Sequence, residues 1–157
     1  MTVSEAVLRI ASGGGIHAFL ILLMPFSIAD GVTPGFVLTV LPAAYAVFLT
    51  VTTLPGLIAF FLERRRAGGK APTLRATKAV PSAVAALLYG FLPASLMITE
   101  GPDALIIASS LFIALFGYLI HRACLAVTFS FAAGAVVRTV ALIAPLLLIL
   151  GLASALP

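Results

Sequence analysis

Two histidines are the residues of this chain best suited to chemistry. His17 and His121 each lie in a long run of apolar residues, and the chain has no other histidine. An imidazole in apolar surroundings requires a hydrogen-bond partner or a path to water. His17 therefore has two interpretations. It is a proton relay, a substrate contact or a haem ligand, or it is a structural side chain bonded to Tyr45, Tyr89 or a threonine on a neighbouring helix.

Haem and metal binding find little support in the sequence. A haem held by His17 would need a second axial ligand at the same depth in the membrane. His121 is expected to lie about two helical turns closer to the membrane surface than His17. The single cysteine, Cys124, excludes an internal disulfide, and no CxxC or Cys/His cluster suggests a zinc site. We therefore expect no cofactor and no metal.

The composition shows what must position these residues. Hydrophobic residues make up 62% of the 157 residues and charged residues only 9%, whereas a soluble domain averages about 25% charged residues. Several uncharged runs reach the length of roughly 20 residues that a helix needs to cross a bilayer. The sequence predicts an all-α integral membrane protein, a single domain over residues 1–157. We expect a polytopic bundle of five transmembrane helices, with four as the alternative.

The spans are expected near residues 10–29, 36–62, 79–99, 104–125 and 136–156. The end of the fourth span is hard to place, because the apolar run continues past His121 to about residue 129. The first span could instead be a cleaved signal peptide, since Arg9 precedes an apolar stretch and residues 27–29 are small-x-small. Glu5 and the glycine run at residues 13–15 count against cleavage.

The placement of charge predicts the orientation. Six of the nine basic residues fall in one short polar segment: Arg64, Arg65, Arg66, Lys70, Arg75 and Lys78. Lys and Arg in short loops mark the cytoplasmic side of a membrane. We therefore place the N-terminus and the loop 63–78 in the cytoplasm, and the turns with Asp30, Glu100 and Asp103 outside. The expected location is a bacterial inner (plasma) membrane. A basic run between two apolar spans argues against nucleic acid as a partner.

Four further polar residues are candidates for contact with a ligand or a partner. Arg122 and Arg138 are interpreted as anchors whose long side chains reach the head groups. If the last helix began near residue 125, Arg138 would instead lie deep and be a functional candidate. Tyr45 and Tyr89 lie within spans, where each hydroxyl requires a partner. His17 is expected to face the bundle.

The packed face of the first helix is expected to carry four neighbours of His17 at helical spacing: Gly13, Gly14, Leu20 and Ile21. Glycine at the first two of these positions would let another helix approach closely. This arrangement would satisfy the imidazole inside the bundle.

The function expected from these features is not catalytic. The chain has no phosphate-binding glycine loop and no HExxH or GxSxG motif. No span contains a carboxylate, which a typical proton- or sodium-coupled carrier uses. We expect a subunit of a membrane complex or a small transport component. Its partners would be the lipid bilayer and other membrane subunits or further copies of the chain.

Two alternatives remain open, so the sequence does not decide whether the chain is an enzyme. One is a membrane-embedded enzyme acting on a lipid or isoprenoid head group. Its site would lie at the inner edge and contain Glu63, Arg64, Arg65, His121 and Arg122. The other is a cofactor-binding subunit that uses His17.

Overall fold

The computed structural model is all-helical and describes residues 1–23, 33–68, 70–130 and 133–156. Its helices are α1 (Val3–Leu23), α2 (Pro34–Arg66), α3 (Arg75–Ala94), the short α4 (Met97–Glu100), α5 (Ala104–Phe129) and α6 (Ala135–Ala155). Five segments are long and apolar enough to cross a membrane, with α3 and α4 together forming the third. An all-α chain with five such helices, and not four, is confirmed.

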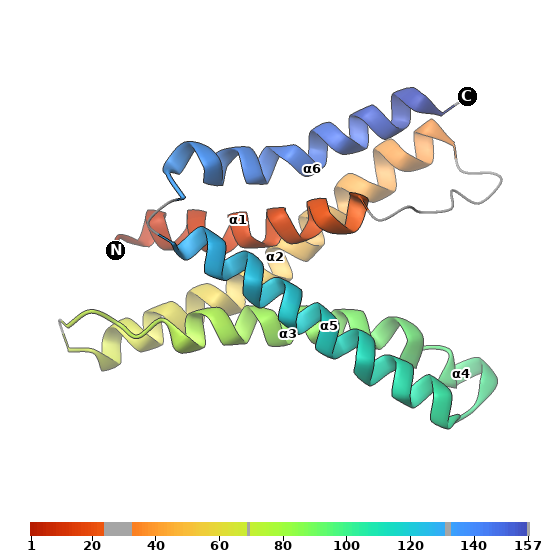
Figure 1. Cartoon of the computed structure of the whole chain (residues 1–157), viewed down its shortest axis with the longest axis horizontal. Coiled ribbons are helices and arrows are strands. Elements are labelled where there is room, and N and C mark those ends of the chain that lie inside the picture. The colour runs from red at the N-terminus through yellow and green to blue at the C-terminus, as the bar shows by residue number, and fades with distance from the viewer. Residues whose placement is uncertain (24–32, 69, 131–132, 157) are drawn as a thin grey trace.

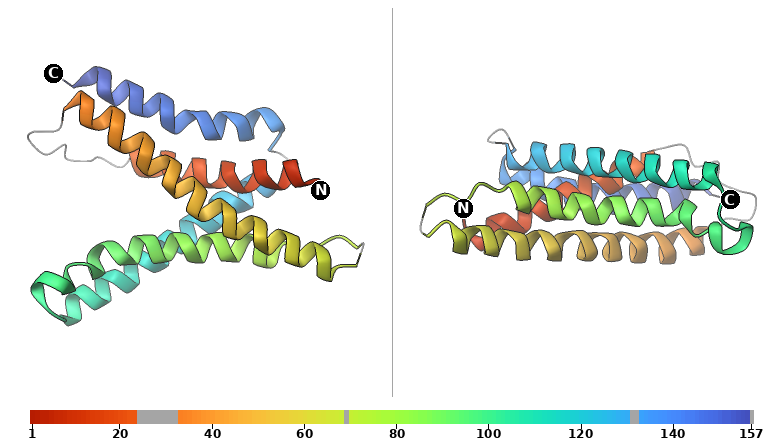
Figure 2. Two further views of the ribbon diagram at one scale, coloured as in Figure 1. Left: turned by 180° about the vertical axis from the view of Figure 1, so that it is seen from behind. Right: turned by 90° about the horizontal axis from the view of Figure 1, so that it is seen from below.

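The helices run back and forth along the long axis of the molecule. Helices α2 and α5 cross each other in the view of Figure 1, with α5 in front and α2 behind. Helices α1 and α3 pass between them. Helix α6 lies along α1. Figure 2 shows the same crossing from behind, with α2 in front. The N-terminus and the starts of α3 and α6 therefore share one end of the molecule, and α4 and the C-terminus lie at the other.

Helix α1 begins earlier than the sequence predicted, at Val3 and not near residue 10. The Thr2 hydroxyl accepts a hydrogen bond from the backbone N–H of Glu5, as a helix N-cap does. Glu5 also forms an ion pair with Arg9 one turn later. Both charged residues therefore lie inside the helix. The expected end near residue 29, the cleavage site at residues 27–29 and the turn at Asp30 lie outside the described residues.

Helix α5 is longer than expected and ends at Phe129, not near residue 125. Asp103 caps its start by accepting the backbone N–H groups of Leu105 and Ile106. Helix α6 begins at Ala135, close to the expected boundary. The alternative in which the last helix begins near residue 125 is therefore wrong.

Three consecutive glycines make α1 the centre of the bundle. A Cβ atom on Gly13 would lie 2.5 Å from the side chain of Leu125 on α5, and one on Gly14 would lie 2.9 Å from Leu49 on α2. A Cβ atom on Gly15 would overlap the backbone of Ala141 on α6. Successive residues of a helix point about 100° apart. Each glycine therefore admits a different neighbouring helix.

The contact with α6 brings the two backbones closest. Pro145 has no N–H to donate to the carbonyl of Ala141, four residues before it. That carbonyl lies against Gly15, where no side chain interferes. Gly15 and Pro145 together therefore allow α6 to pack closely against α1.

The interior contains both apolar and polar side chains, while the outside is apolar. Large apolar side chains lie exposed on every spanning helix, for example Leu23, Ile58, Leu87, Leu105 and Val136. The buried side chains include several polar ones: Ser12, His17, Thr52, Thr77, Ser82, Ser110, His121 and Thr128. So many exposed large apolar side chains are unusual for a soluble protein. This distribution is typical of helices that pack against each other inside lipid.

Candidate functional site: a buried histidine pair

Helices α1 and α5 run antiparallel and bring the two histidines to one level. Gly13 lies against Leu125. One turn further along α1 and one turn back along α5, His17 meets His121. The pair therefore follows from a single register between two helices, and not from proximity in the sequence.

The predicted depth of His121 was wrong. It was expected about two turns nearer than His17 to the membrane surface, but the two imidazoles are in direct contact. The reason lies at the helix ends. Helix α5 continues to Phe129, and the side-chain Nη1 of Arg9 donates a hydrogen bond of 2.9 Å to the carbonyl of that residue. Arg9 and Phe129 are thus level, and each histidine is eight residues from this contact.

The two rings are joined by one buried hydrogen bond. The Nδ1 atoms of His17 and His121 lie 3.0 Å apart, and the residues are only 1% and 0% exposed. One Nδ1 must carry a proton and donate it, while the other accepts. The neutral pair therefore contains two different tautomers. The Nε2 atom of His121 is also buried and has no hydrogen-bond partner among the described residues.

Aromatic rings from two further helices enclose the pair. The ring of Tyr89 on α3 stacks on His17 with centroids 5.3 Å apart and an interplanar angle of 13°. Phe48 on α2 presents an edge-to-face contact to both imidazoles, at 5.5 Å and 6.0 Å. Figure 1 shows why four helices contribute, since α1, α2, α3 and α5 meet where α2 and α5 cross.

Gly117 makes room for this arrangement. A Cβ atom at this position would lie 2.7 Å from the ring of Tyr89. Neither Gly117 nor Phe48 was predicted from the sequence. A signal for the glycine was present, because both histidines follow a glycine by four residues, Gly13 before His17 and Gly117 before His121. Phe48 has no comparable signal among the eleven phenylalanines of the chain.

The partner of His17 differs from the structural interpretation, which named a tyrosine or a threonine. Tyr45 bonds elsewhere, because its hydroxyl donates to the carbonyl of Leu142 on α6 at 2.7 Å. Tyr89 contacts His17 through its ring, and its hydroxyl is buried without a partner in the described part of the chain. The structure thus groups His17, His121 and Tyr89 and separates Tyr45 from them.

The expected packed face of α1 is confirmed in part. Gly13 and Gly14 are buried against neighbouring helices, as predicted. Ile21 is half-buried, and Leu20 is exposed, so its prediction was wrong. Beyond His17, helices α1 and α5 diverge (Figure 1), and the last turn of α1 therefore loses cover on one side.

The distance between the rings suits a proton better than a metal ion. The two Nδ1 atoms are 3.0 Å apart, which is an ordinary hydrogen-bond distance. Two imidazoles on opposite sides of one metal ion, each about 2 Å from it, would hold their nitrogens about 4 Å apart. In the described residues, no group of three or more His, Cys, Asp and Glu is placed to hold an ion. The chemistry that the site supports as it stands is the sharing and transfer of a proton.

No protein-family model, no curated protein and no solved structure matches this chain. Function is therefore argued from the geometry of the molecule. The histidine pair is a fully buried polar contact between two helices. The remaining candidates, Arg122, Arg138 and Glu63, lie closer to the helix ends.

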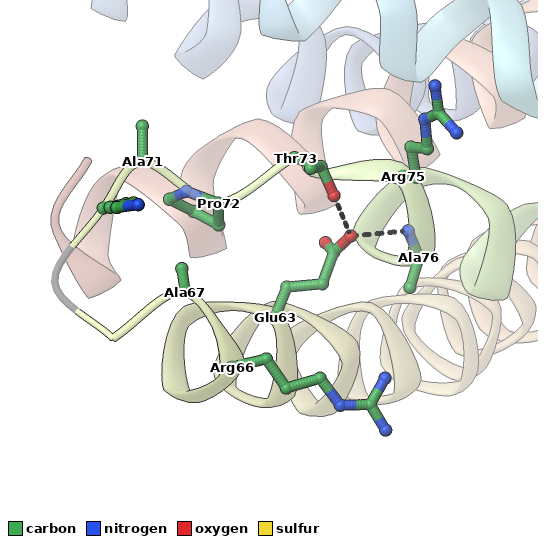
Figure 3. Close-up of a pocket in the computed structure, with 9 residues that line it drawn as sticks. Glu63, Arg66, Ala67, Ala71, Pro72, Thr73, Arg75 and Ala76 are labelled. Carbon is green, nitrogen blue, oxygen red and sulfur yellow. Dashed lines mark hydrogen bonds between the residues drawn. The ribbon is translucent and has the colours of Figure 1, made fainter.

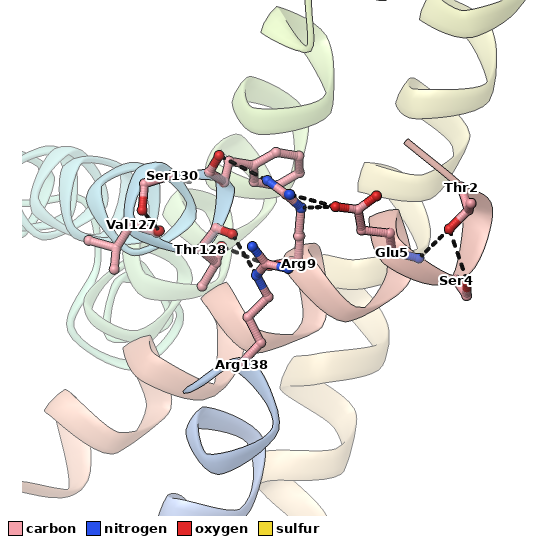
Figure 4. A network of polar contacts seen from close by, with 9 residues as sticks. Thr2, Ser4, Glu5, Arg9, Val127, Thr128, Ser130 and Arg138 are labelled. Atoms are coloured by element: carbon pink, nitrogen blue, oxygen red, sulfur yellow. Dashed lines mark hydrogen bonds and ion pairs between the residues drawn. The ribbon is translucent and has the colours of Figure 1, made fainter. Parts of the chain in front are cut away.

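Two arginines hold the end of α5 (Figure 4). The Nε of Arg138, a residue only 7% exposed, donates to the carbonyl of Thr128 at 3.1 Å, and Arg9 donates to Phe129. The hydroxyls of Ser12 and Thr128 donate in turn to the carbonyls of Arg138 and Arg9. The last carbonyls of a helix lack donors within the helix and attract positive charge. These contacts therefore join α1, α5 and α6.

The anchor interpretation of Arg138 was wrong in its mechanism. The residue does lie near a helix end, in the first turn of α6, but its side chain is buried and bonds α5. Arg122 lies seven residues before the end of α5, deeper than expected, and is half-buried. Its Nη1 atom is buried without a partner among the described residues. Its role as an anchor remains a prediction.

Glu63 closes the connection between α2 and α3. Its carboxylate accepts hydrogen bonds from the backbone N–H groups of Ala76 and Thr77 and from the hydroxyls of Thr73 and Thr77, at 2.6 to 3.1 Å. Helix α3 has no cap of its own, because Leu74 precedes it with a φ of 58° and makes no side-chain cap. Glu63 therefore supplies the cap from the neighbouring helix.

The basic side chains around Glu63 do not converge. Figure 3 shows Arg66 and Arg75 pointing away from the carboxylate in different directions. They line a shallow hollow together with Lys70 and the backbone of residues 71–73. A binding site for one anion would need its cations to point at one place. This end of the molecule is therefore a charged junction with a structural carboxylate.

Proposed function

We propose that this chain is an integral membrane protein that crosses a bacterial inner membrane five times, with the N-terminus and the loop 63–78 in the cytoplasm. The exposed apolar side chains on all five spanning segments support this proposal. Eight of the nine Lys and Arg residues lie near the start of α1, the connection from α2 to α3 or the start of α6, which share one end of the bundle (Figure 1), as expected for the cytoplasmic side. The ninth, Arg122, lies seven residues before the end of α5. The lipid bilayer would then be the first partner of the chain, and nucleic acid would not be one.

Within that membrane, the chain would serve as a small transport component, alone or as a subunit of a larger membrane complex. The observation that carries this proposal is the position of the His17–His121 pair. A polar pair where four helices cross, among otherwise apolar and small side chains, is costly in lipid and marks a functional interior. A subunit with only a packing role would not need it.

The enzyme alternative lacks its acid and base among the described residues. Glu63 would be the carboxylate of such a site, but both of its oxygens accept hydrogen bonds from the start of α3. His121 would be the base, but it faces His17 in the interior. The cofactor alternative is less favoured, because two histidines on opposite faces of a haem iron would hold their nitrogens about 4 Å apart, whereas the two Nδ1 atoms are 3.0 Å apart. We therefore favour transport over either alternative.

The proposal is tested with the tagged chain in native membranes and in proteoliposomes. We expect the chain to stay in the membrane pellet after an alkaline carbonate wash. In proteoliposomes, we expect a transmembrane gradient of at least one inorganic ion to drive charge movement above that of empty liposomes. His17→Phe/His121→Phe, which keeps two aromatic rings and removes their nitrogens, should abolish that movement.

The matched control is Tyr118→Phe. This change removes a tyrosine hydroxyl that takes no part in the contacts described for Tyr45 and Tyr89, and it leaves the histidine pair intact. A chain that is released by carbonate would contradict the membrane assignment. Charge movement equal in wild type and in the double phenylalanine variant would contradict the transport role of the pair.

A further inference from the structure

The hydrogen bond between the two Nδ1 atoms limits how many protons the pair can hold. When both rings are neutral, one proton lies between the rings and one lies on an outer Nε2. The other Nε2 is bare. A proton added there leaves the central bond intact and makes it charge-assisted, which strengthens it. A further proton would place two N–H groups face to face at 3.0 Å. The pair can therefore take up one proton, as a unit.

The structure indicates which nitrogen is bare. The Nε2 of His121 is buried and has no partner in the described part of the chain. A buried N–H without an acceptor is rarer in proteins than a buried acceptor without a donor. The favoured arrangement therefore has His121 donating through Nδ1 and its Nε2 free to accept a proton. His17 then carries its proton on Nε2.

The surroundings of the pair provide no carboxylate. Of the five acidic residues, those at positions 5, 63, 100 and 103 lie near helix ends, and position 30 lies outside the described residues. The titratable groups near the pair are the hydroxyl of Tyr89 on α3 and the thiol of Cys124 on α5, and the nearest cation along the chain is Arg122. From α2 the pair is faced by the ring of Phe48. Helix α6 contacts α1 through the backbone of Ala141 and Leu142 at Gly15, two residues before His17.

These neighbours are compatible with a proton that binds and is released reversibly. A permanent counter-charge would hold a proton at all times, whereas the face of an aromatic ring favours a cation more weakly. Tyr89 stacks its face on His17. The proton, once bound, is also shared between two rings and not confined to one.

We propose that the His17–His121 pair is the proton-binding site of this protein and that the proton is the ion to which its transport is coupled. The incoming proton bonds to the lone pair of an outer Nε2, and its release breaks the same bond, so that no other reactant is needed. The pair takes the place of the buried carboxylate that carriers commonly use. This inference rests on the proposed function, because a proton site without transport would have no such role.

The binding step is tested by nuclear magnetic resonance of the histidine nitrogens, with the intact chain in lipid nanodiscs. At neutral pH we expect one ring protonated at Nδ1 and the other at Nε2, with a coupling between the two Nδ1 nuclei through the shared proton. On acidification both rings should shift together and account for one added proton. Two rings that titrate independently, or the absence of that coupling, would overturn the proposal.

The coupling step is tested in proteoliposomes with a pH-sensitive dye inside. His121→Asn keeps an amide group that can bond His17 but cannot take up the proton. We expect its proton movement to fall at least tenfold below wild type, while Ser110→Ala, another buried polar residue of α5, should match wild type. Equal proton movement in His121→Asn and wild type would refute the inference. Charge movement by another ion with no proton uptake would refute it too, and would leave the proposed function intact.

Discussion

Arg138 illustrates how single residues are satisfied in this bundle. Its guanidinium bonds the carbonyl of Thr128, and its own carbonyl accepts the hydroxyl of Ser12. A charge this deeply buried is favourable only when such partners are present, because its removal from water is costly. Residue type alone did not reveal this, since a surface arginine and a buried one look alike in the sequence. Whether Arg138 is buried depends on where α5 ends, because its partner is the carbonyl of Thr128 in the last turn of that helix.

We expect Arg138→Lys to destabilise the protein, because a lysine ammonium lacks the planar Nε–H that reaches Thr128. The lost hydrogen bond to a charged group should lower the free energy of unfolding by about 1–2 kcal/mol. The buried Cys124 thiol allows the measurement, because a thiol-reactive fluorophore reports its exposure on heating. A fall of roughly 2–6 °C in the unfolding midpoint is expected.

Arg66→Lys is the control for that measurement, since Arg66 is exposed. Its unfolding midpoint should match that of wild type. An unchanged midpoint in Arg138→Lys would restore the interpretation of Arg138 as an anchor that needs only a long cationic side chain.

At the scale of the helices, α1 determines how the others pack. Gly13, Gly14 and Gly15 admit α5, α2 and α6 in turn. Glycine weakens a helix by about 1 kcal/mol relative to alanine. Three in succession are therefore tolerated only because each permits a close helix contact. The histidine pair depends on the first of these contacts, because it shares the register of α1 and α5.

The three glycines should differ in their tolerance of alanine. Gly15→Ala meets the backbone of Ala141, which cannot turn aside, and should cost about 1–3 kcal/mol. Gly14→Ala meets the end of the flexible Leu49 side chain and should cost less. The unfolding midpoints of the two variants, followed through Cys124, measure the difference. Equal midpoints would mean that α6 is free to shift away from α1.

Glu63 allows a second test at this scale. Glu63→Ala removes the only side chain that caps α3 and should lower the free energy of unfolding by about 1 kcal/mol. Hydrogen exchange at the amides of Ala76 and Thr77 should become faster. Glu100→Gln changes an exposed carboxylate on the short α4 and should leave these amides unchanged. Unaltered exchange in Glu63→Ala would show that α3 begins without this cap.

The sequence predicted the helices better than their contacts. Five apolar segments and the starts of α2, α5 and α6 could be read from hydropathy and turn residues, because a bilayer sets the length of a span. The start of α1 was missed, since Glu5 and Arg9 looked like flanking charges and not like an ion pair within a helix. The partner of His17 could not be predicted, because the register between two helices depends on where both begin and end.

The whole molecule is asymmetric along its long axis. Eight of the nine basic residues lie near the end that contains the N-terminus, the start of α3 and the start of α6. The opposite end carries the carboxylates of Glu100 and Asp103 near α4 (Figure 2). Basic residues in short loops are retained on the cytoplasmic side. For the proposed membrane protein, this asymmetry predicts one orientation in the bilayer.

We expect Lys70 to face the cytoplasm and Asp103 to face outward. The test places one cysteine at either position in a Cys124→Ala chain and treats intact cells with a maleimide that cannot cross membranes. Asp103→Cys should react at once, and Lys70→Cys only after the membrane has been opened. Both positions are exposed, so accessibility within the bundle does not limit either reaction. Reaction of Lys70→Cys alone in intact cells would reverse the orientation. A proton moving into the cell would then reach the histidine pair from the basic end of the bundle and leave toward the acidic end.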